Sequence, residues 1–200
     1  MRRPLVIVGA LGAVAIAAAA GALVFRPHPA QGVASHVATS AKIGGPFTLI
    51  DTQGRTVTDR DLLGKPTVVY FGFTYCPEVC PTTLTALSAW LKTLGPDADR
   101  LNVVFVTIDP ERDTPKQLGA YLSAFDPRIR GLTGTPAQVA AAARQYLVYY
   151  QKVPLGGGSY TMDHSTSVYL MDRHGQLDDL IAYQEPAEDA LAKLRRLARS

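Results

Sequence analysis

The chain contains two cysteines, Cys76 and Cys80, with three residues between them. They are expected to lie between the carboxyl end of a buried strand and the first turns of the next helix, where the helix N-terminus favours the thiolate form. Pro77 and Pro81 restrict the backbone around both thiols, so the two sulfurs can converge on one point. Because thiolates bind metals and attack disulfides, the pair indicates either a soft-metal site or redox chemistry.

The spacing of the two thiols helps to distinguish three possible roles: a structural disulfide, thiol–disulfide exchange and metal binding. A disulfide kept for stability is reasonable in an exported protein, but its very short loop would contribute only about 2 kcal/mol in the loop-entropy model. Thiol–disulfide enzymes characteristically have two residues between their cysteines, and a closed zinc site needs four ligands. Two thiolates and one imidazole suit a Cu(I) site of low coordination number, and an added oxygen ligand or water would admit Cu(II).

His164 is the expected source of the imidazole. It lies just before a predicted strand at Ser167–Met171, on a predicted loop that packs beside the cysteine turn in a thioredoxin-like sheet. Thioredoxin-type enzymes usually carry a proline at this place, and residues 155–185 contain none. The other histidines are His28 and His36, in a segment without periodicity, and His174, at a predicted hairpin tip.

Cys76, Cys80 and His164 are therefore the predicted metal ligands, and the two cysteines are also the candidates for redox activity. Two acidic residues stand beside them in the sequence. Asp163 is a candidate partner for the second imidazole nitrogen, because metal-bound imidazoles commonly donate their other N–H to a carboxylate or carbonyl. Glu78 is expected to tune the charge of the site, to face a partner or to face solvent.

The loop Asp109–Pro115 (DPERDTP) follows the second buried strand at the same edge of the sheet. Its carboxylates could hold magnesium or perform acid–base chemistry. A turn accounts for the same residues, with Asp113 or Thr114 capping the next helix and Arg112 pairing locally. We favour the turn and expect the loop to shape the rim of the site.

From residue 43 onward, the elements that must position these groups alternate between strands and helices. This order predicts a thioredoxin-like α/β fold with a central mixed sheet flanked by helices. Strands are expected at 47–50, 55–57, 67–73, 101–108, 167–171 and 177–183, with a short one at 148–150; helices are expected at 81–94, 115–125, 136–146 and 187–198, and a glycine loop at 156–158.

An N-terminal transmembrane helix is predicted at residues 5–25, which carry no charge and would span roughly 30 Å. Two arginines before the segment and one after it place residues 1–4 in the cytoplasm. Residues 26–42 are then a flexible tether, and residues 43–200 form a domain on the periplasmic or equivalent outer side. A cleavable signal peptide is the alternative. Both interpretations export the domain.

The formal net charge of +3 comes from this membrane end of the chain. The first 30 residues hold three arginines and no acidic residue, so the other 17 basic residues balance 17 acidic ones. The only short basic run, at 193–199, suits the last turn of a helix. Nucleic-acid binding is therefore excluded as the main role.

Five segments carry a resemblance to a known family: FGFTYCPEVCP (71–81), DPERDTP (109–115), LTGT (132–135), VYY (148–150) and DHS (163–165). Together, over roughly residues 43–185, they resemble the Sco/SenC family. The resemblance implies a membrane-tethered copper protein of thioredoxin fold that serves assembly of the copper A centre of cytochrome c oxidase. The resemblance implies that Cys76, Cys80 and His164 bind Cu(I) or Cu(II). Two departures are small: Tyr75 stands where some members have His, and Glu78 where many have Asp.

The resemblance implies a non-enzymatic metallochaperone that delivers copper to the copper A subunit of the oxidase. Other periplasmic copper chaperones and thioredoxin-like reductases are further candidate partners. The alternative is a thiol–disulfide oxidoreductase that keeps the copper-ligating cysteines of the oxidase reduced. A redox signalling protein is a third hypothesis.

Overall fold

The computed structural model describes residues 42–200. The predicted anchor at 5–25 and all but the last residue of the predicted tether lie outside these residues. Within the described range, no helix is both long enough and apolar enough to cross a membrane.

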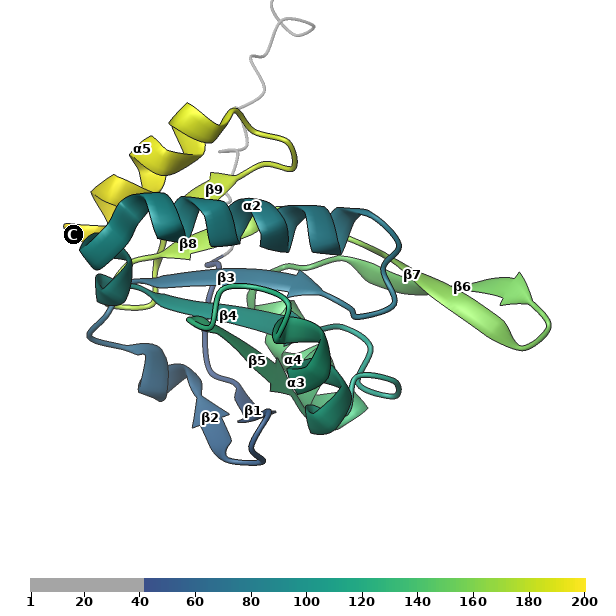
Figure 1. Ribbon diagram of the computed structural model, residues 1–200. Helices are drawn as coiled ribbons and strands as arrows, with labels where there is room; N and C mark the ends of the chain where they lie inside the picture. The colour runs from purple at the N-terminus through teal and green to yellow at the C-terminus, as the bar shows by residue number, and fades with distance from the viewer. Residues whose placement is uncertain (1–41) are drawn as a thin grey trace, which may run out of the picture. The chain divides into compact units, whose positions relative to one another are not determined.

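Seven strands form one mixed sheet in the order β2-β1-β5-β4-β3-β8-β9 (Figure 1). Its three central strands are parallel: β3 (Thr67–Gly72), β4 (Asn102–Thr107) and β5 (Ile129–Thr133). The outer strands pair antiparallel: β1 (Thr48–Asp51), β2 (Thr56–Thr58), β8 (Val168–Met171) and β9 (Leu177–Ile181). A separate two-stranded sheet consists of β6 (Tyr150–Gly156) and β7 (Ser159–His164).

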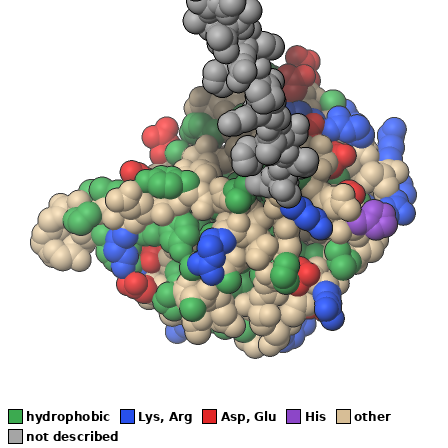
Figure 2. Space-filling model, turned by 180° about the vertical axis from the view of Figure 1, so that it is seen from behind, with side chains coloured by type: hydrophobic (Ala, Val, Ile, Leu, Met, Phe, Trp, Pro, Cys, Tyr) green, Lys and Arg blue, Asp and Glu red, His purple; other side chains and the backbone are tan. Residues whose placement is uncertain are grey.

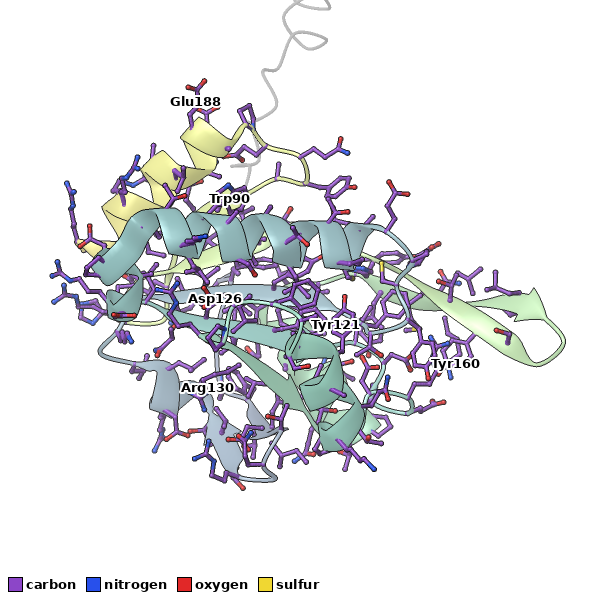
Figure 3. All side chains as sticks on the ribbon, in the orientation of Figure 1. Trp90, Tyr121, Asp126, Arg130, Tyr160 and Glu188 are labelled. Carbon is purple, nitrogen blue, oxygen red and sulfur yellow. The ribbon has the colours of Figure 1, made fainter. Side chains whose placement is uncertain are left out.

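Helices cover both faces of the large sheet (Figure 1). One face carries α2 (Val79–Leu94) and α5 (Ala187–Ala198), and the other carries α3 (Pro115–Leu122) and α4 (Pro136–Gln145). All six residues of β3 are buried, which explains its continuous run of apolar residues. Trp90 on α2 belongs to the same core, as expected (Figure 3). Two short 3-10 helices, η1 (Asp59–Leu62) and η2 (Gly95–Arg100), connect elements.

The thioredoxin-like α/β prediction is confirmed, with several local differences. Helix α2 begins at Val79, two residues before Pro81, because N–H groups in the first turn have no acceptor within the helix and proline therefore fits there. Helix α3 ends at Leu122 instead of continuing to Phe125. Strand β5 was not predicted. His164 is the last residue of β7, so the predicted loop around it is wrong.

The β6–β7 hairpin extends away from the large sheet (Figures 1 and 2). Its turn contains Gly156, Gly157 and Gly158, all with positive φ between 58° and 88°. The predicted glycine loop is thus a tight turn between two strands. Most residues of both strands are exposed or half-buried, so the polar sequence on either side of the glycines gave no strand pattern.

Charged side chains of both signs are interspersed on the face seen in Figure 2. The basic run on α5 is paired with acidic residues of the β9 region. Arg196 lies 2.7 Å from Asp179, and Lys193 lies 2.8 Å from Glu185. This pairing of Lys193 and Arg196 agrees with the balance of charge in the sequence.

Candidate metal centre

The register of the sheet brings the predicted ligands to one edge. Strands β3 and β4 run parallel and end together, with Gly72 beside Thr107. Strand β8 begins at Val168, which pairs with Tyr70 near the carboxyl end of β3. The segment between β7 and β8 therefore lies at the edge where the loop after β3 carries the cysteines. This arrangement brings His164 to the sulfurs although 84 residues separate it from Cys80.

The two cysteines occupy different positions in the turn from β3 into α2. Cys76 is half-buried in the loop, and Cys80 is fully buried in the first turn of the helix. The backbone N–H of Cys80 donates to the Sγ atom of Cys76 at 3.3 Å. That N–H has no acceptor within the helix, so the sulfur satisfies it as a capping side chain would. Both thiols are free.

His164 completes the cluster. Its Nε2 atom lies 3.6 Å from Sγ of Cys80. Its Nδ1 atom donates to the main-chain carbonyl of Ser165 at 2.7 Å, because a carbonyl can only accept. In the neutral imidazole, this hydrogen bond leaves a lone pair on Nε2, the ring nitrogen that lies beside Sγ of Cys80. The ring also packs edge-on against Phe73, with centroids 5.8 Å apart.

One ligand atom from each of Cys76, Cys80 and His164 lies within 4.8 Å of the others. In residues 42–200 they form the one group of three or more such side chains that could hold a metal ion. Asp163 was a candidate partner for the second imidazole nitrogen, but it does not orient the ring. The carbonyl of Ser165 accepts that hydrogen bond, and the Asp163 side chain is exposed. Glu78 is also exposed.

The two thiols have opposite electrostatic environments. A hydrogen bond from the Cys80 side chain, opposed by burial and helped by His164 and backbone N–H groups, lowers the pKa of Cys76 to about 4. The interaction with Cys76, together with burial, raises the pKa of the Cys80 thiol well above its ordinary value. Without metal, the pair therefore holds its negative charge on the more accessible sulfur.

A cavity of about 400 Å³ opens beside the cluster, with Phe73, Cys76, Pro77, Tyr149, Met162 and His164 among its lining residues. Tyr149 at this cavity is 58% exposed. Solvent and ligands can thus reach Cys76 and His164 from one side, while the core closes the other side.

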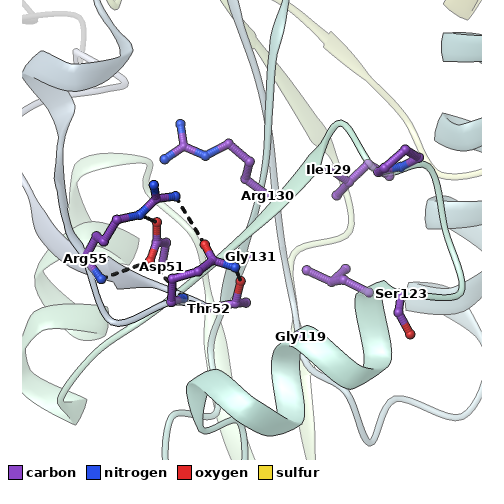
Figure 4. Close-up of a pocket in the computed structure, with 11 residues that line it drawn as sticks. Asp51, Thr52, Arg55, Gly119, Ser123, Ile129, Arg130 and Gly131 are labelled. Atoms are coloured by element: carbon purple, nitrogen blue, oxygen red, sulfur yellow. Dashed lines mark hydrogen bonds and ion pairs between the residues drawn. The ribbon is translucent and has the colours of Figure 1, made fainter.

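A second hollow of about 330 Å³ lies between the β1–β2 turn, α3 and β5 (Figure 4). It contains neither cysteine and no histidine. The carboxylate of Asp51 there already accepts hydrogen bonds from the backbone of Gln53 and from Arg55. We assign no chemistry to it.

The loop 109–115 supports the cysteine turn from behind. The carboxylate of Asp113 is fully buried and accepts hydrogen bonds from the backbone and hydroxyl of Thr74, at 3.0 and 2.6 Å, and from the hydroxyl of Thr107 at 2.6 Å. Burial raises the pKa of Asp113, against the lowering effect of these hydrogen bonds. Asp113 or Thr114 was predicted to cap the next helix, and Thr114 is the cap.

Within residues 42–200, the one further histidine, His174, does not join the site. His174 is exposed at the turn between β8 and β9, as expected. His28 and His36 lie outside the described residues. Asp109 pairs with Arg112, which confirms the predicted local ion pair of the loop.

A family model described as SCO1/SenC matches residues 35–199. The chain belongs to this family. Protein SenC of Rhodobacter capsulatus is 47% identical over 133 residues, which are 66% of this chain and 60% of that protein. The chain spans about 40% to 60% of the length of the first curated SCO1/SenC relatives.

Solved structures of family members match the fold. ScoI of Bradyrhizobium japonicum with copper bound is 49% identical, with a TM-score of 0.73, covering 78% of this chain and 99% of that one. Yeast Sco1 with copper bound is 41% identical, with a TM-score of 0.74, covering 80% and 90%. The copper in these SCO1/SenC relatives and the Cys–Cys–His cluster of this chain agree with the predicted cofactor.

Proposed function

We propose that this protein is a copper metallochaperone that binds copper through Cys76, Cys80 and His164. The proposal is carried by the convergence of the three donors, with their ligand atoms within 4.8 Å of one another. Two thiolates and an imidazole are soft and borderline donors, which suit Cu(I), and an added oxygen ligand or water would admit Cu(II). The copper-bound structures of ScoI and yeast Sco1 support the choice of metal.

The accessibility of the cluster suits a metal that must leave. Cys80 is fully buried, whereas Cys76 and His164 line a cavity open to solvent. An incoming ligand can therefore approach the bound ion from that cavity while Cys80 still holds it. A closed four-ligand site would hinder such an exchange, as structural zinc sites do.

The copper acceptor, in this proposal, is the copper A subunit of cytochrome c oxidase during its assembly. The family resemblance supports this assignment, and BsSco, a solved structure of similar fold, is a member of the Sco family of cytochrome c oxidase assembly proteins. The uncharged segment 5–25 would hold the protein in the cytoplasmic membrane, with the domain on the outer side. Other periplasmic copper chaperones and thioredoxin-like reductases are further proposed partners.

Copper titration of the purified, reduced full chain tests the ligand assignment. The wild type should bind one copper ion, and His164→Ala should weaken Cu(II) binding by at least about 100-fold, because loss of outer partners of a ligand alone costs about 10- to 100-fold. His174→Ala is the matched control, since that imidazole is exposed at a turn. Equal Cu(II) affinity in wild type and His164→Ala would refute the role of His164.

A thiol–disulfide oxidoreductase is the alternative, favoured by the two free thiols that lie close together. A disulfide switch has been identified in BsSco. In this role, the Cys76 thiolate would attack a disulfide of the oxidase subunit, form a mixed disulfide and release the first thiol of the partner. Cys80, on losing its proton, would then attack the Cys76 sulfur, release the second thiol of the partner and leave a Cys76–Cys80 disulfide. A thioredoxin-like dithiol reductase would reduce that disulfide again.

Oxidase activity in a deletion strain separates the hypotheses. Full rescue by His164→Ala with none by Cys80→Ser would favour the oxidoreductase, because that chemistry needs both thiols but no imidazole ligand. Failure of both variants would favour the metallochaperone. Normal oxidase levels in the deletion strain would instead point to redox signalling.

A further inference from the structure

Arg112 lies among three aromatic rings beside the metal cluster. Its guanidinium carbon is 3.7 Å from the ring centroid of Tyr160, 4.6 Å from that of Tyr75 and 5.9 Å from that of Phe73. Its side chain is only 21% exposed and pairs with Asp109. Arginine suits these contacts because its guanidinium is flat, weakly hydrated and able to stack on aromatic faces.

These rings belong to the two segments that carry the ligands. Tyr75 directly precedes Cys76, and Phe73 packs against the ring of His164. Tyr160 lies on β7, four residues before His164 and opposite Pro154 of β6 (Figure 3). One guanidinium therefore touches both the cysteine loop and the histidine strand.

Hydrogen bonds reinforce the contact between Arg112 and β7. The Nη1 atom of Arg112 donates to the main-chain carbonyl of Tyr160 at 2.9 Å. The hydroxyl of Tyr160 donates to Asp109 at 2.8 Å, and Asp109 in turn accepts from Nε of Arg112. Lys152 on β6 extends the contact, since its ammonium lies 4.2 Å from the Tyr160 ring centroid and 2.8 Å from Glu111.

The hairpin has few other attachments. Met162 is the one buried residue in β6 and β7, and Tyr150 is partly buried against the core. Beyond the hairpin, the backbone N–H of Ser165 donates to the carbonyl of Tyr149. A two-stranded hairpin is marginally stable alone in water, so its orientation depends on such contacts.

We propose that Arg112 is a positioning residue for the metal centre, which holds β7 against the cysteine loop and so keeps His164 within reach of the copper. The inference rests on the proposed function, because it presumes that His164 is a ligand. Lysine would keep the charge but lose the planar contacts and the paired N–H groups. Arg112→Lys should therefore impair the site nearly as much as Arg112→Ala.

The first measurement uses the metal-free, reduced full chain. Hydrogen exchange of the amides between Thr161 and Ser165 should be at least about tenfold faster in Arg112→Lys than in the wild type, because local opening becomes easier. Arg128→Lys is the matched control: its side chain is 30% exposed and pairs with Asp126, but it stands at the opposite edge of the sheet. Unchanged exchange in Arg112→Lys, or an equal change in Arg128→Lys, would overturn the proposal.

The second measurement follows the imidazole nitrogen in the electron paramagnetic resonance spectrum of the Cu(II) protein. Arg112→Lys and Arg112→Ala should lose much of this nitrogen coupling and bind Cu(II) about 10- to 100-fold more weakly, as other outer-partner changes do. Their thermal unfolding reports whether the fold is intact, and Arg112→Lys serves if Arg112→Ala does not fold. A wild-type signal retained in Arg112→Lys would overturn the positioning role.

The two measurements separate this inference from the proposed function. Absence of nitrogen coupling in the wild type, with the exchange result as expected, would refute His164 as a ligand but not the attachment of β7 by Arg112. Nitrogen coupling in the wild type with no effect of Arg112→Lys on either measurement would refute the inference alone.

Discussion

The cysteines and the histidine stand on supports of very different rigidity. Cys76 and Cys80 follow β3, the most deeply buried strand, and lead into α2, whose apolar stripe packs on the sheet. His164 ends a hairpin that extends from the body and exposes most of its residues (Figure 1). The site therefore combines a fixed pair of sulfurs with an imidazole on a peripheral arm.

This difference indicates which part of the site tolerates change. Strain at the cysteines must be absorbed by a close-packed core, which resists changes of even one methyl group. Strain at the tip of the hairpin can be absorbed by solvent-exposed strands. Substitutions near the sulfurs should therefore disturb both stability and metal binding, whereas those of exposed side chains at the hairpin tip that make no contact with Arg112 should disturb neither.

The largest effect is expected from Gly72→Ala on the cysteine side. A Cβ atom on Gly72 would stand 2.8 Å from both Sγ of Cys80 and the ring of Phe105, which real atoms cannot do without moving. Overpacking of a core typically costs about 1–3 kcal/mol in the free energy of unfolding. We expect a loss of that size, measured by urea unfolding, together with weaker copper binding.

Gly119→Ala is the control for this substitution. Gly119 lies in α3, where an added Cβ would make only ordinary contact with Thr52 at 3.5 Å. Alanine should stabilise the helix there by about 0.5–1 kcal/mol. If both alanine variants had the same free energy of unfolding, the close fit of Cys80 against β3 would not determine which residue position 72 tolerates.

A smaller effect should appear in the pH dependence of stability through Asp113, which supports the cysteine turn. Burial raises its pKa in the folded protein, so the folded state binds this proton more tightly than the unfolded chain. The contribution of Asp113 is therefore fully favourable below its unfolded pKa of about 3.9 and declines as pH rises through the folded pKa. The stability of the wild type relative to Asp113→Asn should fall over that interval in urea unfolding.

Asp126→Asn should show the opposite sign. Hydrogen bonds from Arg128, opposed by burial, lower the pKa of Asp126 in the folded protein. Its contribution is present above the unfolded pKa and is lost as pH falls through the folded pKa. The two variants thus form an internal comparison, and the same slope in both would contradict the assignment for Asp113.

The smallest effect is expected from Leu155→Ser near the tip of the hairpin. Leu155 is 65% exposed, so little apolar surface returns to water on its replacement. The free energy of unfolding should change by less than about 0.5 kcal/mol, and copper binding should stay at the wild-type level. A loss of copper affinity would show that the hairpin tip is coupled to His164 more tightly than its exposure indicates.

The sequence was sufficient to predict those strands, helices and ligands that are marked by a pattern within a single segment. The buried run in β3, the leucine stripe of α2 and the cysteines between them each carry a clear periodicity or spacing. The strand β5 escaped prediction because it contains Gly131 in a short, mixed sequence. Gly131 is needed for tertiary packing: a Cβ there would come within 2.9 Å of Leu118 and Leu122.

The groups around the ligands were harder to predict because their roles depend on contacts between distant segments. The carbonyl of Ser165 orients His164. Because every residue has a main-chain carbonyl, the sequence cannot indicate which one accepts this hydrogen bond. Asp113 and Arg112 were expected only to cap or pair within their own loop. Their contacts with Thr74 and Tyr160 arise only when the sheet brings three segments to one edge.

The unequal burial of the two sulfurs gives the site a direction of approach. Cys80 is fully buried at the start of α2, and Cys76 stands between it and the open cavity. Any ion, thiol or oxidant that arrives from solvent consequently meets Cys76 before it meets Cys80. Although Cys76 and Cys80 have the same side chain, the fold alone determines which of them a molecule from solvent encounters first.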